Sequence, residues 1–214
     1  MLDDLSPLAT RLLGCLLEKE RTTPEAYPLT LNSLMAAANQ TTNRDPIMAA
    51  SADEVETALD ELRGQKLAAL VMMAGARVSK FRHVMLDEYD LQPSELALLC
   101  TLLLRGPQTA GELKSRSDRL HGFSTIEDVE ETLRALGTGD EPLVRQLPAR
   151  PGQKGARWVQ LFSGEPPAEE FTPATSAPRE PSRLEQLQER VQTLETEMAE
   201  LREEFRTFRQ QFES

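Results

Sequence analysis

The sequence predicts a mainly α-helical fold with small β wings: tandem winged helix-turn-helix domains followed by a C-terminal coiled-coil helix. An order of apolar helix, short capped helix, longer helix and two strands with a basic turn occurs twice before Gly164. Five prolines then fall within residues 164–182, and an unbroken heptad repeat follows them. We therefore expect winged-helix domains at 1–87 and 88–163, a proline-rich linker at 164–182 and a coiled-coil helix at 183–213.

Composition and charge indicate a cytoplasmic protein without a membrane segment. Hydrophobic residues make up 39% of the 214 residues, and no apolar run approaches the ~18–20 residues that span a bilayer. The N-terminus, Met-Leu-Asp-Asp-Leu, lacks the basic start of a secretory signal. The net charge is −11, of which residues 164–214 carry −6, so the predicted domains are close to neutral at −3 and −2.

The first copy is expected to contain helices at residues 5–22, 31–38 and 51–66. Leucines recur at helical spacing in the first helix, and Thr23-Pro24 ends it because a residue before proline avoids the helical region. Thr30 is suited to cap the second helix, and Ser51-Ala-Asp-Glu54 is a capping box that begins the third. The expected strands are Leu67–Met73 and Arg77–Leu86, joined across Ala74-Gly75-Ala76.

The second copy repeats this pattern from Pro93 onward. Thr109-Ala-Gly-Glu112 is a capping box before a short helix, and Ser124-Thr-Ile-Glu127 is another before a longer one. Gly137 suits the end of the longer helix. The expected strands are Leu143–Leu147 and Ala156–Phe162.

The two cysteines, Cys15 and Cys100, occupy equivalent apolar helices in the two copies. We expect both to be buried, reduced thiols, since free cysteine packs as a small hydrophobe. No ligand side chains stand near either one in the sequence, which disfavours a disulfide or a metal site. We expect no metal and no cofactor.

The tail carries a heptad repeat that predicts a parallel, homo-oligomeric coiled coil. With Leu184 at position a, the g positions and the following e positions of a parallel in-register pair carry opposite charges. The alternative is one amphipathic helix that folds back on its own domains, and the strand number stays open. The apolar positions expected to drive oligomerisation are Leu184, Leu187, Val191, Leu194, Met198, Leu201, Phe205, Phe208 and Phe212.

Several short segments carry a resemblance to a known family. They are Glu18-Lys-Glu20, Thr23-Pro24, Tyr27-Pro-Leu29, Leu31-Asn-Ser-Leu34, Asn39-Gln40, Asn43-Arg-Asp-Pro46, Leu104-Arg-Gly-Pro-Gln-Thr109, Gly111-Glu-Leu113 and Arg119-Leu120-His121. On these segments the chain resembles the YceH-like family of uncharacterised bacterial proteins. The resemblance implies a tandem winged-helix fold and brings no activity, ligand or catalytic residue.

Charge is sorted between the predicted third helices and the predicted strand pairs. Each third helix carries a net charge of −3, which the phosphates of a duplex would repel. The strand pairs carry cations without a carboxylate, an arrangement suited to phosphate contact, although Lys and Arg also protect sheet edges. We expect Trp158 to pack in the core. The predicted DNA contacts are Arg77, Lys80, Arg82, Arg145, Arg150, Lys154 and Arg157.

The loop at residues 39–46, which precedes the predicted third helix of the first copy, is a second candidate site. Asn43 and Arg44 there are suited to grip a phosphate or a partner's backbone. The alternative is a hydrogen-bonded turn in which Asp45 pairs with Arg44.

Enzyme activity is disfavoured, because the sequence lacks phosphate-binding glycine loops, HExxH and GxSxG, and no catalytic residue is assigned. Two functions remain: DNA binding through basic wings, or a protein-protein interaction adaptor that uses the acidic third helices and the coil, without nucleic acid.

We predict that residues 183–213 drive self-association, because a pair of heptad faces buries apolar side chains that a single helix exposes. A chain that ends at Gly164 should have the mass of a monomer in light scattering, and the full chain a multiple of it. Equal masses for the two would refute the prediction.

Overall fold

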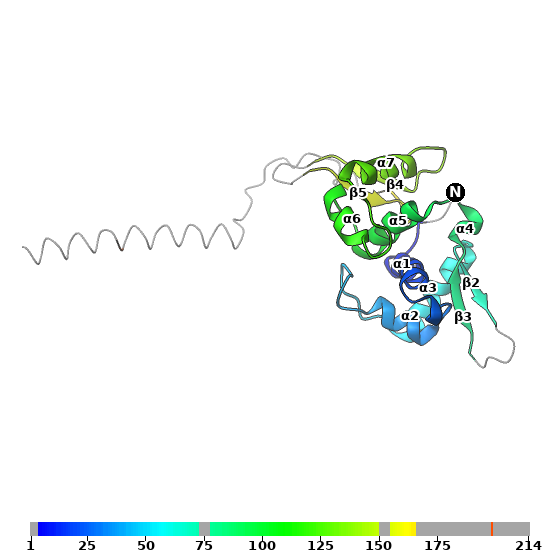
Figure 1. The fold of residues 1–214 in the computed structure, drawn as a ribbon. Coiled ribbons are helices and arrows are strands. Elements are labelled where there is room, and N and C mark those ends of the chain that lie inside the picture. The colour runs from blue at the N-terminus through cyan, green and yellow to red at the C-terminus, as the bar shows by residue number, and fades with distance from the viewer. Residues whose placement is uncertain (1–3, 73–77, 150–154, 166–197, 199–214) are drawn as a thin grey trace, which may run out of the picture. The chain divides into compact units, whose positions relative to one another are not determined.

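The order of three helices and two strands occurs twice among the residues that the structure, a computed structural model, describes (Figure 1). These are residues 4–72, 78–149, 155–165 and Met198. The first copy consists of α1 (Pro7–Thr22), α2 (Leu31–Ala38), α3 (Ala52–Gly64), β2 (Ala68–Val71) and β3 (Lys80–His83). The second consists of α5 (Pro93–Arg105), α6 (Ala110–Ser117), α7 (Ile126–Leu136), β4 (Val144–Leu147) and β5 (Arg157–Gln160). The remaining elements are η1 (Pro24–Ala26), β1 (Leu29–Thr30) and α4 (Met85–Glu88).

The described residues are therefore mostly helical with two small antiparallel sheets, which confirms the predicted fold class at that level. The chain divides into two compact units, Met1–Pro173 and Ala174–Ser214. Of the predicted coiled coil, only Met198 is described: it is helical and its side chain is exposed. The other residues predicted to drive oligomerisation lie outside the described part of the chain.

Capping side chains begin three of the four helices for which the sequence predicts a cap. The Thr30 hydroxyl accepts from the Ser33 amide, and both halves of the predicted box at Ser51 are formed. Thr109 and Glu112 form the second predicted box. The third prediction was wrong by one residue, because Thr125 and Asp128, rather than Ser124 and Glu127, cap α7. A threonine beside a serine offers the same hydroxyl, so the sequence pattern fits both registers.

The strands are shorter than predicted, and one was missed. The first sheet has the order β1-β3-β2, with Leu29 opposite Phe81. The two-residue strand β1 carries too little pattern to predict. The strand expected to reach Leu86 ends at His83, because Met85 begins α4 and is fully buried. The second sheet is the β4–β5 pair, with Gln146 opposite Trp158.

Helices α1 and α5 pack directly against each other at the centre of the described structure (Figure 1). They approach each other closely at Gly14, where a Cβ atom would lie 2.9 Å from Leu104 Cδ2 and 3.0 Å from Leu103 Cβ. The Cys100 thiol donates a 3.4 Å hydrogen bond to the Gly14 carbonyl at this contact. Glycine at position 14 therefore sets how closely the first helices of the two copies pack.

The buried side chains of both copies form one continuous hydrophobic core, because the α1–α5 contact joins them. Cys15 and Cys100 are buried, unpaired thiols in this core, as predicted. Burial raises the pKa of Cys15 to about 11, so the thiol stays protonated at neutral pH. The segment before α1 contacts both copies. The Leu5 amide donates to the Phe162 carbonyl at 2.7 Å, and the Ser6 hydroxyl donates to Glu61 on α3.

We predict that Gly14→Ala lowers the free energy of unfolding by about 1–2 kcal/mol, because the α1 and α5 backbones must move apart to admit the methyl group. The intrinsic helix preference of alanine offsets part of that loss. Urea titration followed by circular dichroism measures the change. Gly64→Ala is the matched control: apart from its chain neighbours and the backbone of its own helix, no atom lies within 4 Å of its Cβ position, so we expect unchanged or slightly higher stability. A Gly14→Ala protein as stable as Gly64→Ala would contradict the packing argument.

Candidate functional site

The predicted DNA contacts fall on the two strand pairs. Lys80 and Arg82 lie on β3, Arg145 on β4 and Arg157 on β5. The other three predicted contacts, Arg77, Arg150 and Lys154, lie outside the described residues. β3 packs against α1, whereas β5 packs against α5, so each pair belongs to its own copy (Figure 1).

A carboxylate from outside the strands reaches one cation of the first strand pair, Arg82. Arg82 Nη2 lies 3.3 Å from Asp87 Oδ2 of α4, and this ion pair is exposed to solvent. His83, at the end of the same strand, is buried, with Nε2 2.8 Å from Glu20 Oε2 of α1. His83 therefore packs beneath the strand and is not a surface residue. The described cations of this strand pair that reach the surface are Lys80 and Arg82.

The second pair shows the same compensation. Arg145 forms an exposed ion pair with Glu165. Arg157 donates to the Pro107 carbonyl at 3.0 Å and lies 4.0 Å from Glu112 of α6. Trp158 is buried, which confirms that it packs in the core, and its backbone exchanges hydrogen bonds with Gln108. Three of the four described strand cations thus already have acceptors, although their sequence neighbours include no acid.

The exposed faces of the third helices are acidic. Arg63 on α3 pairs with Asp60 at 2.7 Å, and Arg134 on α7 pairs with Glu130 at 2.8 Å. Each of these helical cations is therefore neutralised within its own helix. The remaining exposed carboxylates, which would repel phosphate, are Asp53, Glu54, Glu56, Glu127, Asp128 and Glu131.

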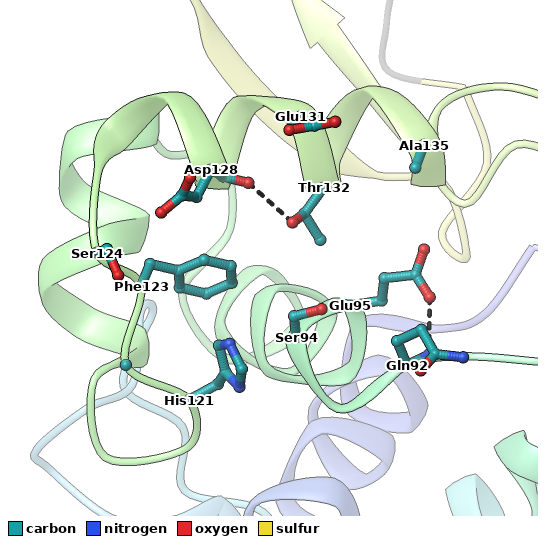
Figure 2. A pocket seen from close by; sticks show the side chains of 11 residues that line it. Gln92, Ser94, Glu95, His121, Phe123, Ser124, Asp128, Glu131, Thr132 and Ala135 are labelled. Atoms are coloured by element: carbon teal, nitrogen blue, oxygen red, sulfur yellow. Dashed lines mark hydrogen bonds between the residues drawn. The ribbon is translucent and has the colours of Figure 1, made fainter.

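An open groove of about 420 Å³ lies between α7, the start of α5 and the 121–124 loop, and we call it the acidic groove (Figure 2). Phe123 and His121 lie at one end, with their ring centroids 4.7 Å apart, and Glu95 lies towards the other. Thr132 of α7 points between them (Figure 2). The remaining lining residues are Gln92, Ser94, Gly122, Ser124, Asp128, Glu131 and Ala135.

Arg44, a predicted loop contact, is a buried structural residue. Its side chain has no exposed surface, and Nη2 and Nη1 donate to Glu18 of α1 at 2.6 and 3.2 Å. Nε donates to the Ala37 carbonyl at 3.0 Å. The prediction that Asp45 pairs with Arg44 was wrong, because Asp45 is exposed and its backbone amide donates to the Leu104 carbonyl. Arg44 is therefore not available to a phosphate.

Asn43, the other predicted loop contact, is exposed and touches the second copy. Its φ of +59° is a conformation that asparagine tolerates better than most residues. Its side-chain oxygen accepts a hydrogen bond from Arg105 at the end of α5. The 39–50 loop thus connects α2 to α5 through Asn43.

Three arginines that were not predicted as contacts gather at this junction. Arg105, Arg116 and Arg119 line a cavity of about 50 Å³, together with Thr22 of α1 and Asn43; we call it the basic cleft. Its residues are scattered along the chain, so no local charge run marks it. One feature of the sequence could have indicated this cleft: four of the segments that carry the family resemblance meet there. They are Glu18–Glu20, Asn43–Pro46, Leu104–Thr109 and Arg119–His121.

Among the described residues, no group of three or more His, Cys, Asp or Glu side chains is placed to hold a metal ion. No helix in that part of the chain is both long and apolar enough to cross a membrane.

We predict that Glu18→Gln destabilises the protein by about 3 kcal/mol at pH 7, because it leaves the buried Arg44 without its carboxylate. Burial raises the pKa of Glu18, but Arg44 outweighs that effect and holds the pKa below the ordinary carboxyl value. A lowered pKa in the folded state stabilises the protein above the unfolded value of about 4.3, and that stabilisation is lost as the pH falls through the folded value.

Unfolding free energies at pH 7, 5 and 4 measure this effect. The difference between wild type and Glu18→Gln should be constant from pH 7 to 5 and shrink below about pH 4.3. Glu25→Gln, at an exposed carboxyl on η1, is the control and should change stability little. A pH-independent difference for Glu18→Gln would show that charge pairing is not its cause.

Comparison with known proteins identifies relatives along nearly the whole chain. A "UPF0502 protein" of Azoarcus sp. strain BH72 is 45% identical over 214 residues, covering 98% of this chain and 95% of the relative. Proteins with the same description from Geotalea uraniireducens and Geobacter sulfurreducens are 46% and 47% identical, covering 98% and 92% of this chain and 98% and 90% of those relatives.

A family model described as "Protein of unknown function, DUF480" matches residues 5–153. This span contains both sets of three helices, the first sheet, the acidic groove and the basic cleft. The expected resemblance to an uncharacterised bacterial family is confirmed at that level, while the YceH-like name stays a prediction. The chain belongs to the DUF480 family, and the UPF0502 proteins are its relatives.

Proposed function

We propose that the protein is a tandem winged-helix protein that binds double-stranded DNA through its strand pairs rather than through its third helices. The repeated order of three helices and two strands supports the winged-helix assignment. A winged helix usually contacts DNA with its third helix and its wing, but fold alone is an analogy and the surface must supply the chemistry.

The observation that carries the proposal is the distribution of exposed charge. Cations lie on β3, β4 and β5, and exposed carboxylates cover α3 and α7. The ion pairs Arg82–Asp87 and Arg145–Glu165 are exposed on both sides, and such pairs contribute only about 0–1 kcal/mol. A duplex phosphate can therefore replace either carboxylate at little cost, whereas it would be repelled by the third helices.

The two strand pairs pack against different helices and lie on different sides of the α1–α5 pair (Figure 1). We therefore propose that each pair contacts DNA separately, so that one protomer has two weak contacts. The predicted coiled coil would multiply these contacts and raise the overall affinity by avidity. Binding of this kind depends on phosphates and has little sequence preference.

We predict that replacing Arg77, Lys80 and Arg82 together by Gln weakens binding to a short random-sequence duplex and flattens its salt dependence. The slope of log affinity against log salt should fall by about 0.9 for each phosphate that the variant no longer neutralises. Fluorescence anisotropy over a series of NaCl concentrations measures both quantities. Replacing Arg145, Arg150 and Lys154 by Gln should act similarly, and the effects of the two triple variants should add.

The matched control is Arg63→Gln with Arg134→Gln, which removes the cations that pair within the third helices. This variant should leave affinity and salt slope unchanged. A larger loss of affinity in the control than in the strand variants would place the DNA contact on the third helices and contradict the proposal.

A protein-protein interaction adaptor is the second candidate, and the acidic groove favours it. The groove combines Phe123 and His121 with the carboxylates Glu95, Asp128 and Glu131, a surface that suits a basic segment of a partner (Figure 2). In the same anisotropy experiment, absence of salt-sensitive DNA binding by the wild-type protein would favour the adaptor.

A further inference from the structure

The basic cleft lies where α1, the 39–50 loop, α5 and the end of α6 meet. Its volume of about 50 Å³ exceeds the ~30 Å³ that one water occupies in the liquid, so it admits a small group and not a whole nucleotide. None of its lining residues is aromatic. A ligand there would be recognised by polar contacts, without stacking.

Positive charge in the basic cleft exceeds the negative charge available to balance it. Among the described residues, Glu18 is the only carboxylate that lines it, and the buried Arg44 at 2.6 Å and Lys19 at 3.1 Å already neutralise that group. Within residues 4–72, 78–149 and 155–165, Arg105 and Arg119 have no carboxylate in ion-pair contact. Arg116 lies 3.3 Å from Glu112, a carboxylate that also approaches Arg157.

The structure holds two of these guanidinium groups in place. Arg105 donates to the Asn43 side chain, and Arg116 donates to Gln108 Oε1 at 2.7 Å. Gln108 is itself buried, and its amide donates to the Thr101 carbonyl at 3.1 Å. Burial lowers the pKa of Arg105, and the positive charges of Arg116 and Arg44 lower it further, while the negative charges of Glu18 and Asp45 offset part of that effect. The arginines are thus held together despite their mutual repulsion.

We propose that the basic cleft is a phosphate-binding site formed by Arg105, Arg116 and Arg119. A guanidinium presents a planar fork of N–H donors that matches two phosphate oxygens, and three such groups would surround one tetrahedral anion. A bound phosphate would supply the negative charge that the neighbouring side chains lack. Thr22 and Asn43, from α1 and the 39–50 loop, border the same space, so binding would connect the two copies.

The phosphate would belong either to a small phosphorylated compound or to a nucleic-acid backbone, and the chemistry of recognition is the same for both. None of Arg105, Arg116 and Arg119 is among the proposed contacts on the strand pairs, although Glu112 lies within ion-pair distance of both Arg116 and Arg157. Phosphate binding at the cleft can therefore hold whether or not the strand pairs bind DNA.

The test is isothermal titration calorimetry of the full chain with inorganic phosphate, at an ionic strength held constant with NaCl. We expect saturable binding by the wild-type protein. Arg119→Gln and Arg105→Gln should each weaken it by about 10- to 100-fold, the effect of removing charge-assisted hydrogen bonds. Arg119 is exposed and makes no hydrogen bond or ion pair with the described residues, so its replacement should leave the fold intact, which circular dichroism would verify.

Arg63→Gln is the control, because it removes an exposed cation of α3 outside the cleft and should leave phosphate binding unchanged. No saturable binding by the wild type would overturn the proposal, and so would equal weakening in Arg63→Gln and Arg119→Gln. The triple variant of Arg77, Lys80 and Arg82 should keep phosphate binding, which separates this site from the proposed DNA contacts.

Duplex binding by Arg105→Gln and Arg119→Gln then distinguishes the two sources. Unchanged duplex affinity together with weakened phosphate binding assigns the site to a small phosphorylated compound. A parallel weakening of both assigns it to the nucleic-acid backbone.

Discussion

The close packing of α1 on α5 is the contact on which the rest of the described structure depends. Gly14 has no side chain, so the backbone of α1 lies against Leu103 and Leu104 and its carbonyl accepts from Cys100. Burying a leucine fully contributes about 1.5–3 kcal/mol, and this contact joins the leucines of both copies into one core. Each copy is too small to bury a large core by itself, so the shared core stabilises both.

A second constraint, the buried Arg44–Glu18 pair, fixes the 39–50 loop of the first copy, which contacts the second copy. Arg44 ties the 39–50 loop to α1, and Arg11 reinforces this by donating to the Pro46 carbonyl at 2.8 Å. With the loop held, Asn43 reaches Arg105 at the end of α5. The basic cleft is therefore a consequence of how the two copies pack, which explains why its residues come from both.

The charge distribution predicted from the sequence differs most from the structure at the strand pairs. Along the sequence the strand pairs carry cations without acids, but in three dimensions Asp87 and Glu165 pair with Arg82 and Arg145. Asp87 of α4 pairs with Arg82 of β3, and Glu165, which follows β5, pairs with Arg145 of β4. Both carboxylates lie outside the strands, so the net charge of each strand pair in the sequence does not include them. The acidity of α3 and α7 persists, because their cations pair within the same helix.

The local elements can be predicted from the amino-acid sequence, because helical periodicity, proline stops and capping boxes depend on neighbours three or four residues away. These patterns placed α1, α2, α3, α5 and α6 closely. It misplaced the cap of α7 by one residue and missed β1 and α4, because adjacent hydroxyls and very short elements carry little pattern. Contacts made in the folded chain bury Arg44 against Glu18 rather than pairing it with Asp45, and they bring Arg105, Arg116 and Arg119 into one cleft. Those outcomes depend on contacts between residues far apart in the chain, where burial and Coulomb interactions outweigh any local preference.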